Sequence, residues 1–364
     1  MSKASSILGV NGLRNVAAAW GISRLLGFCA LVVTPTQDGR WFNTFGLTTM
    51  DGGWYRMIID SGYPGGPVPS HGTVWPFFPL YPGITGLLVD LGVRVGPALI
   101  AVSWISAFAA LAGIMALAHR RFGEPTAVMA VWLAALVPGS LGLVLSYSDG
   151  FFVAGVAWTL FAIDVILDQP SDKRLDLRWA VVGTLALIAT SSRPNGVVVA
   201  VVAMVAACRA RRFLETFLVV APSLVFLGVW MMFSESRSGD PLAFVTAKSG
   251  WTEIQIWEFI AHPTQRITVV FHVLVMLGSL LIAGRALRRL PIHWLMLAFL
   301  LLAPSMVLGM EGLARYSMFA VPLTIAMAIR LIEHDRSVRI SVLMFAGFWM
   351  MFLGVNVVRY SWVP

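Results

Sequence analysis

The sequence has 364 residues, of which 58% are hydrophobic and only 12% are charged, and the charges are grouped between long apolar runs. This distribution excludes a soluble globular domain and is typical of a helical protein that crosses a membrane many times. The net charge of +8 does not indicate a nucleic-acid partner, because excess Lys and Arg in a membrane protein usually orients the chain. We predict an all-α fold, since the apolar runs are continuous and longer than the alternating segments of a transmembrane barrel.

A membrane-spanning helix needs about 20 apolar residues, and about eleven runs approach this length. We interpret the first run as a retained helix and not a signal peptide, because Arg24 interrupts it and no clear cleavage pattern follows. Two of the runs are short and are separated by the polar break SSRPNG. The predicted spans are 15–34, 96–118, 126–145, 150–167, 179–192, 196–208, 213–233, 266–284, 291–309, 316–332 and 339–357.

Residues 79–93 are short for a span, and we predict that they form an interfacial helix. This choice leaves the basic loops HRR, CRARR and RALRR on the cytoplasmic side, as the positive-inside rule requires. We therefore expect one integral membrane domain over residues 1–364, without a soluble domain. The outward-facing segments would be 35–95, 146–150, 191–196, 234–265 and 310–316, and they would meet at one extracytoplasmic face.

The first outward loop contains the stretch MDGGWYRMIIDSGY. Its apolar and aromatic residues recur at helical spacing, which predicts a short amphipathic helix in the membrane interface. Asp51 precedes the first turn of this helix and is either a plain N-cap or a functional carboxylate. The Pro- and Gly-rich coil that follows contains His71 and several aromatics, which suit the interface and would equally stack on a sugar or lipid head.

Two further outward segments interrupt the apolar pattern. SYSDG places Asp149 at the joint between two spans, where a helix N-cap is the simpler interpretation and catalysis the alternative. SSRPNG places Arg193 near the bilayer, where an arginine is costly and implies an anionic partner such as a phosphate. Snorkelling of Arg193 to the outer headgroups is the alternative.

The last two outward segments add cations and aromatics. Lys248 and Trp251 lie in an interfacial loop, and Arg315 lies at the outer end of a span, four residues after Glu311, where an intrahelical ion pair can form. The sequence contains no P-loop, HExxH, GxSxG or Cys/His cluster. These patterns together indicate an outward site for a lipid-borne phosphate or diphosphate.

Several of these segments resemble one known family. MDGGWYRMIIDSGY followed by FFPLYP resembles the signature of the PIG-V family of mannosyltransferases, membrane enzymes of the GT-C class. SYSDGFF, SSRPNG, GDPLAFVTAKSGW and ARYSMFAVPL resemble further blocks of that family in the same order, between about residues 45 and 325. The likeness is greatest to bacterial members, in particular actinobacterial ones. It implies an inverting glycosyltransferase of the plasma membrane that moves a sugar, expected to be mannose, from a polyprenyl-phosphate donor to a lipid-linked or cell-envelope acceptor.

The resemblance implies that Asp51 is the catalytic base, because GT-C enzymes keep their acidic catalytic residue in the first extracytoplasmic loop. We predict that cations bind the donor phosphate and that aromatic side chains wall the substrate site. The phosphate-binding candidates are Arg193, Arg315, Lys248 and His71. The wall candidates are Trp54, Tyr55, Trp75, Tyr81 and Trp251, and the secondary candidates are Asp149, Asn195 and Tyr316.

No cofactor is expected, although three outward carboxylates, Asp51, Asp60 and Asp149, leave a divalent metal as an alternative. The expected partners are the polyprenyl-linked donor, a glycolipid or envelope acceptor and membrane lipids, and no nucleic acid. Two other classes stay open, namely a lipid or lipid-linked-sugar flippase and a catalytically silent scaffold of an envelope-synthesis complex. The absence of an internal repeat and the gathering of ionisable residues at the membrane faces favour an enzyme over a transporter.

Overall fold

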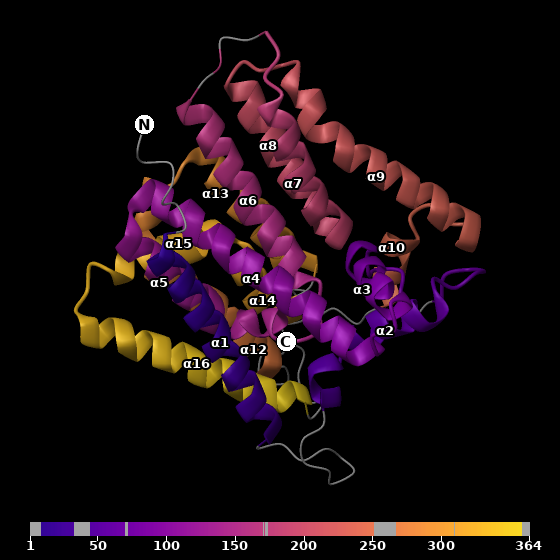
Figure 1. Cartoon of the computed structure of the whole chain (residues 1–364), viewed down its shortest axis with the longest axis horizontal. Coiled ribbons are helices and arrows are strands. Elements are labelled where there is room, and N and C mark those ends of the chain that lie inside the picture. Colours follow the sequence, from indigo (N-terminus) through magenta and orange to yellow (C-terminus); the bar gives the residue numbers. More distant parts are fainter. Residues whose placement is uncertain are drawn as a thin grey trace.

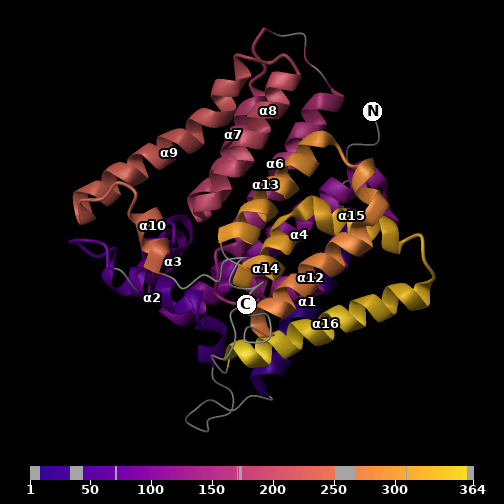
Figure 2. The same cartoon turned by 180° about the vertical axis from the view of Figure 1, so that it is seen from behind.

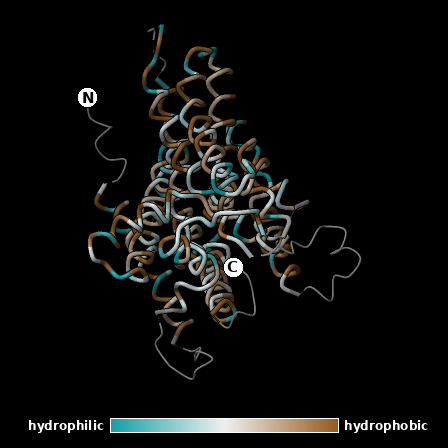
Figure 3. Tube along the Cα trace, turned by 90° about the vertical axis from the view of Figure 1, so that its right-hand side faces the viewer, coloured by the Kyte–Doolittle hydropathy of each residue, from teal (hydrophilic) through white to brown (hydrophobic). Residues whose placement is uncertain are grey.

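The computed structural model describes residues 9–32, 44–69, 72–169, 171, 174–250, 267–308 and 310–358. These residues form helices joined by short turns and contain no strand, which confirms the all-α prediction. The helices pack as tilted rods, with α9 and α16 at opposite edges of the bundle (Figure 1). Hydrophobic residues run along most of the trace (Figure 3).

Most predicted spans correspond to helices. Five stretches of the described residues are long and apolar enough to cross a membrane: Val95–Phe122, Asp149–Asp168, Glu215–Ser238, Thr268–Arg289 and Arg336–Val358. The chain is therefore a multi-pass membrane protein, and the total of eleven spans stays a prediction. The principal helices are α1 (Val10–Val32), α4 (Val95–Phe122), α5 (Glu124–Leu136), α6 (Asp149–Asp168), α7 (Arg178–Ser192), α8 (Val197–Arg209), α9 (Glu215–Ser238), α12 (Ile267–Ala283), α13 (Ile292–Leu308), α15 (Val321–Leu331) and α16 (Arg336–Val358).

Two predicted spans are interrupted in the structure. In the predicted span 126–145, α5 ends at Leu136 and the chain continues as the 3-10 helix η3 (Pro138–Leu143). The reason is Pro138, which disfavours helical geometry at the residue before it, and Val137 accordingly has ψ 147°. The predicted span 316–332 is also divided, at Ala320 (φ −73°, ψ 66°), into α14 (Leu313–Phe319) and α15. Both interruptions place irregular backbone close to polar side chains.

The first loop forms short helices, as the spacing predicts. Residues Asp51–Ser61 form α2, and Leu80–Asp90 form α3, an eleven-residue helix within the segment predicted to be interfacial. With α10 (Ala243–Thr246), they lie together below one end of α9 in both views (Figures 1 and 2). A cluster of buried aromatic side chains fills this region.

At the centre of the bundle, α6 packs along α4 and along α7. Glycines allow their backbones to approach closely. A Cβ at Gly155 of α6 would lie 2.7 Å from the backbone nitrogen of Ala189 in α7, and a Cβ at Gly150 would lie 2.6 Å from that of Ala107 in α4. Such contacts through small residues are typical of membrane helices. They fix the start of α6, where the candidate site lies.

Candidate active site

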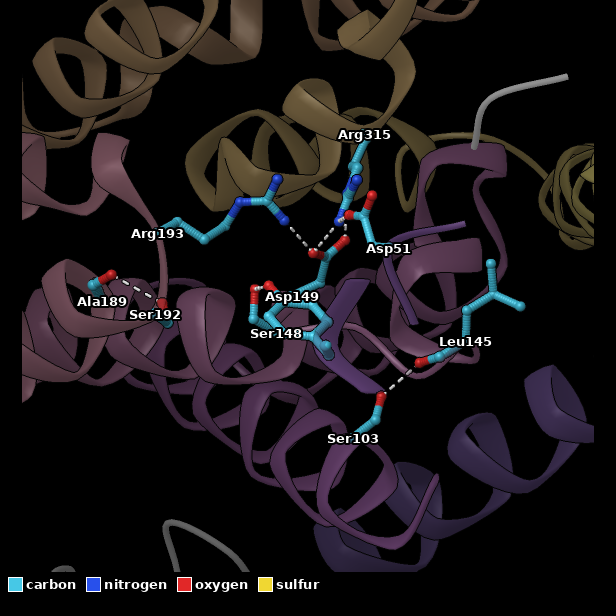
Figure 4. Close-up of polar contacts among 10 residues, drawn as sticks. Asp51, Ser103, Leu145, Ser148, Asp149, Ala189, Ser192, Arg193 and Arg315 are labelled. Carbon is cyan, nitrogen blue, oxygen red and sulfur yellow. Dashed lines mark hydrogen bonds and ion pairs between the residues drawn. The ribbon is translucent and has the colours of Figure 1, made fainter. Parts of the chain in front are cut away.

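Four charged side chains from distant parts of the sequence meet at the start of α6 (Figure 4). Asp51 is the first residue of α2, and Asp149 is the first residue of α6. Arg193 lies at the break between α7 and α8, and Arg315 lies in α14. Each of the four comes from a different segment that the sequence predicts to face outward. The structure therefore brings together the predicted base, two of the predicted phosphate ligands and one secondary candidate.

Asp149 is the hub of this network. Its side chain is 0% exposed, and its carboxylate accepts hydrogen bonds from both arginines. Arg315 binds it through two parallel bonds, from Nε to Oδ2 and from Nη2 to Oδ1, both at 2.6 Å. Arg193 donates from Nη1 to the same Oδ1. Because a buried carboxylate is stable only when it is paired and hydrogen-bonded, the two guanidinium groups explain how Asp149 remains in the interior.

Asp51 is the more accessible carboxylate of the network. Its side chain is 18% exposed, and its Oδ2 accepts one hydrogen bond, of 2.8 Å, from Arg315 Nη2. The N-cap position of α2 is occupied by Met50, which has the strained backbone angles φ 53° and ψ −118°. Asp51 is thus not the N-cap of this helix, and its carboxylate is directed at Arg315 (Figure 4).

Both arginines lie against aromatic rings, and they differ in the number of hydrogen bonds that their guanidinium groups make. Arg315 lies 4.6 Å from the ring centre of Tyr147, and Arg193 lies 5.0 Å from that of Phe319. Among the described residues, Arg193 hydrogen-bonds only to Asp149, so its Nε and Nη2 keep their donors for another acceptor. The carboxylate partners of Arg315 in the described part of the chain are Asp149 and Asp51, and the side chain of Glu311 lies outside that part.

The irregular segment before Asp149 is held by side chains of α1 and α4. Its carbonyls cannot rely on a regular helix, and unpaired backbone groups are costly within a membrane protein. Three donors satisfy three consecutive carbonyls: Arg24 Nη2 to Leu143 O at 2.6 Å, Trp104 Nε1 to Val144 O at 2.8 Å and Ser103 Oγ to Leu145 O at 2.6 Å. The last of these bonds is visible in Figure 4. Arg24, the cation within the first predicted span, therefore hydrogen-bonds to the backbone segment that precedes Asp149.

Two further contacts fix this region. The hydroxyl of Tyr55 in α2 donates to Ser148 Oγ at 2.7 Å, which connects the helix of Asp51 to the start of α6. Burial raises the pKa of Tyr55 above its ordinary value, so its hydroxyl stays protonated and remains a donor. Gly142 leaves the space that the Asp149 carboxylate fills, since a Cβ at Gly142 would lie 2.0 Å from Asp149 Oδ2. Neither the Tyr55 bond nor the Gly142 contact has a local sequence signal.

The aromatic wall candidates are mostly buried. Trp75 and Tyr81 are 0% exposed, Tyr55 is 2% exposed, and all three belong to the aromatic cluster around α2, α3 and α9. The Tyr55 and Tyr81 ring centres are 4.6 Å apart. Trp54 is half-buried and stacks on Phe77 at 6.2 Å. In this structure the three buried rings contact other side chains, and a role as substrate wall stays a prediction for all four.

The remaining candidates lie around the network or outside the described residues. Lys248 is exposed in the 3-10 helix Ala247–Gly250 and is not one of the four networked residues. Asn195 follows Arg193 in the turn, and its Nδ2 is buried without a hydrogen-bond partner in the described part of the chain. Tyr316 packs edge-on against Phe319 at 5.5 Å. The predicted residues His71 and Trp251 lie outside the described residues.

The described residues contain no group of three or more His, Cys, Asp or Glu side chains placed to hold a metal ion. Asp51 and Asp149 bind arginine, whereas Asp60 pairs at 3.4 Å with Arg56, one turn earlier on α2. A cation at this position would compete with Arg315 for both carboxylates. The donor set therefore favours anion binding through the two arginines.

The chain matches known proteins in its fold but not in its sequence. No family model and no curated protein matches the sequence. The crystal structure of ArnT from Cupriavidus metallidurans bound to undecaprenyl phosphate matches with a TM-score of 0.58 at 14% identity, over 91% of this chain and 62% of that one. This chain has the GT-C fold. At this level of identity the likeness establishes the fold and not the reaction.

Two other GT-C structures match over nearly the whole chain. The Archaeoglobus fulgidus oligosaccharyltransferase in complex with Zn and sulfate matches with a TM-score of 0.50 at 13% identity, over 94% of this chain and 52% of that one. The arabinofuranosyltransferase AftD from Mycobacteria also gives a TM-score of 0.50, at 16% identity, over 96% of this chain and 27% of that one. The chain thus spans about half to three fifths of the length of the first two structures. Membership of the PIG-V family and an actinobacterial origin stay predictions.

Proposed function

We propose that this protein is an inverting glycosyltransferase that takes its sugar from a polyprenyl-phosphate-linked donor. The observation that carries the proposal is the network in which an accessible carboxylate, Asp51, lies beside two arginines with donors for a phosphate. The GT-C fold supports it, because the three matched structures are glycosyltransferases, and one of them was solved with undecaprenyl phosphate.

In the proposed reaction, Asp51 is the general base. Its free carboxylate oxygen takes the proton of the acceptor hydroxyl while that oxygen attacks the anomeric carbon of the sugar. The bond between the anomeric carbon and the phosphate oxygen breaks on the opposite face, and its electron pair goes to the phosphate. The products are the inverted glycoside, polyprenyl phosphate and a protonated Asp51, so atoms and charge balance.

The arginines would stabilise the leaving group. The donor is a phosphodiester with one negative charge, and its phosphate gains a second charge as the bond breaks. Cations that contact this phosphate therefore stabilise the transition state more than the ground state. Arg193 offers Nε and Nη2, and Arg315 offers Nη1, none of which makes a hydrogen bond among the described residues.

The finer parts of the proposal come from the sequence. The resemblance to PIG-V mannosyltransferases supports mannose as the sugar and a glycolipid or envelope molecule as the acceptor. The resemblance also supports the plasma membrane as the location. The distribution of Lys and Arg supports an orientation with residues 35–95 and the active site on the extracytoplasmic side. No step of the proposed reaction requires a metal, since a lipid phosphate is already a good leaving group.

The test is transfer of radiolabelled mannose from polyprenyl-phosphate mannose to a membrane lipid extract by the purified protein in nanodiscs. We expect transfer by the wild type and a loss of about 100-fold or more in Asp51→Asn, the magnitude typical of a general base. The matched control is Asp60→Asn, which removes an exposed carboxylate of the same helix and should leave transfer unchanged.

The outcomes separate the function classes. Equal transfer by the wild type and Asp51→Asn would keep the enzyme and remove Asp51 from the base role. If the wild type transfers neither mannose, glucose nor arabinose from polyprenyl phosphate, the glycosyltransferase proposal is refuted. A flippase would then be expected to move labelled lipid across vesicle membranes without forming a new product.

A further inference from the structure

Arg315 binds the two carboxylates of the network unequally. Asp149 receives two of its hydrogen bonds, is fully buried and is also held by Arg193. Asp51 receives a single bond, from the same Nη2 that serves Asp149, and its side chain is partly exposed. Bidentate, buried pairs of this kind are stronger than single, partly exposed ones. Asp149 is therefore the fixed partner of Arg315, and Asp51 is the exchangeable one.

Arg315 occupies part of the Asp51 carboxylate. The hydrogen bond from Arg315 takes one of the two carboxylate oxygens and holds the group toward the guanidinium. The base and the phosphate ligand of the proposed reaction thus bind each other when no substrate is present. In the described part of the chain Nη1 of Arg315 is open to a phosphate, but a phosphate that also contacts Nη2 competes with Asp51 for the same N–H group.

We propose that Arg315 restrains Asp51 until the donor phosphate takes its place on Nη2, and that Asp149 is the positioning residue that holds both arginines during this exchange. This inference rests on the proposed function. The donor then binds before the acceptor is deprotonated, and the freed Asp51 stands next to a bound anion. Asp149, fully buried behind the guanidinium groups, does not contact the substrate.

The charges of the network agree with this exchange. Two aspartates and two arginines sum to zero, so the donor phosphodiester adds one negative charge to a neutral cluster. If Asp51 moves away from Arg315, the phosphate meets two cations and one remaining carboxylate, which is a net charge of +1. A phosphate therefore displaces Asp51, which has one hydrogen bond to the arginines, more easily than Asp149, which has three.

The experiment measures direct binding of radiolabelled undecaprenyl phosphate to the full-length protein in nanodiscs. Asp51→Asn removes the competing charge, so we expect it to bind the lipid about tenfold more tightly than the wild type. Asp149→Asn frees both arginines from their anchor, and we expect binding about tenfold weaker. Asp60→Asn, which carries the same charge change on the exposed face of α2, should bind as the wild type does.

Opposite changes in the two site variants are a result that mere structural damage does not produce. Affinity in Asp51→Asn equal to that of the wild type, or a decrease in both variants, would overturn the inference while leaving the proposed function intact. Absence of binding to the wild type would overturn both.

A structure of the wild type with undecaprenyl phosphate gives an independent measurement that needs no variant. We expect Arg315 Nη2 to keep its bond to Asp149 and to lose the 2.8 Å contact with Asp51. Retention of that contact beside a bound phosphate would also overturn the inference.

Discussion

Replacement of Gly142 by alanine tests whether the position of the Asp149 carboxylate matters for catalysis. A Cβ at residue 142 would lie 2.0 Å from Asp149 Oδ2 and 3.5 Å from Arg315 Nε. Carbon and oxygen atoms approach to about 3.3 Å at closest, so the carboxylate oxygen must move by about 1.3 Å. That displacement breaks the 2.6 Å bond from Arg315 Nε to Oδ2 and leaves Arg315 held through Nη2 alone.

The size of the effect follows from the bond that is lost. A hydrogen bond to a charged group contributes about 1.5–3 kcal/mol, and each 1.4 kcal/mol changes a rate about tenfold. We therefore expect Gly142→Ala to lower the rate of sugar transfer by about 10- to 100-fold. The loss should appear in kcat and in the affinity for undecaprenyl phosphate, because both depend on the position of Arg315.

The assay compares sugar transfer, lipid-phosphate binding and melting temperature for the wild type, Gly142→Ala and Gly83→Ala in nanodiscs. Gly83 lies in α3, and a Cβ there meets no atom within 4 Å, so this variant controls for the substitution itself. Full activity and unchanged lipid affinity in Gly142→Ala would refute the reasoning. It would mean that the Arg315 to Asp149 geometry is not needed for the reaction.

Three further predictions concern residues outside the four-residue network. Trp75→Ala should lower the stability by about 3–5 kcal/mol in unfolding measurements with little change in donor KM, since Trp75 is fully buried; a raised KM at unchanged stability would instead make it a substrate wall. Arg24→Met should lower melting temperature and kcat together, because it leaves a carbonyl of the segment before Asp149 unpaired; unchanged values would contradict this role. Hydrogen bonds from Arg178 lower the pKa of Asp176, so the stability lost in Asp176→Asn should be present near neutral pH. It should decline once the pH falls below about 4 and disappear as the pH falls through the lowered pKa, in melting curves recorded at several pH values. A difference that persists in acid would exclude that ion pair as its cause.

Local patterns were sufficient for the parts of the fold that depend on local physics. Hydropathy predicts the apolar helices, Pro194 and its neighbours predict the break between α7 and α8, and helical spacing predicts α2. The positive-inside rule groups Asp51, Arg193 and Arg315 on one face, and the structure places all three in one network. Their proposed roles in the reaction stay predictions.

The hub of the network was not predictable in the same way. Asp149 precedes an apolar run, which is the ordinary signature of an N-cap, and only its contacts with Arg193 and Arg315 distinguish it. Arg315 and Asp51 are separated by 264 residues, a distance at which no periodicity reports contact. Gly142 and Arg24 act through close packing and a backbone carbonyl, and neither effect leaves a pattern in the sequence.

The aromatic residues show a related limit. Trp and Tyr suit a membrane interface, a sugar and a protein core equally well, so composition alone does not distinguish these environments. In the structure, Trp75 and Tyr81 are buried in a cluster that connects the first loop to α9. Their depth depends on how α9 closes over the loop, which is a tertiary effect.

The close contact between η3 and α14 bears on when the entropic cost of positioning Arg315 is met. A Cβ at Gly139 would lie 2.0 Å from the carbonyl oxygen of Ala314, so the residue before Arg315 rests directly on backbone. Because backbone atoms have no rotamers, this contact fixes the position of the Arg315 backbone once the protein has folded. The entropic cost of placing Arg315 is therefore met during folding and not in each cycle of the proposed reaction. If the proposed function holds, substrate loops on the same scaffold can therefore diverge in sequence, and with them the choice of acceptor, while the preorganised charge centre keeps its dimensions.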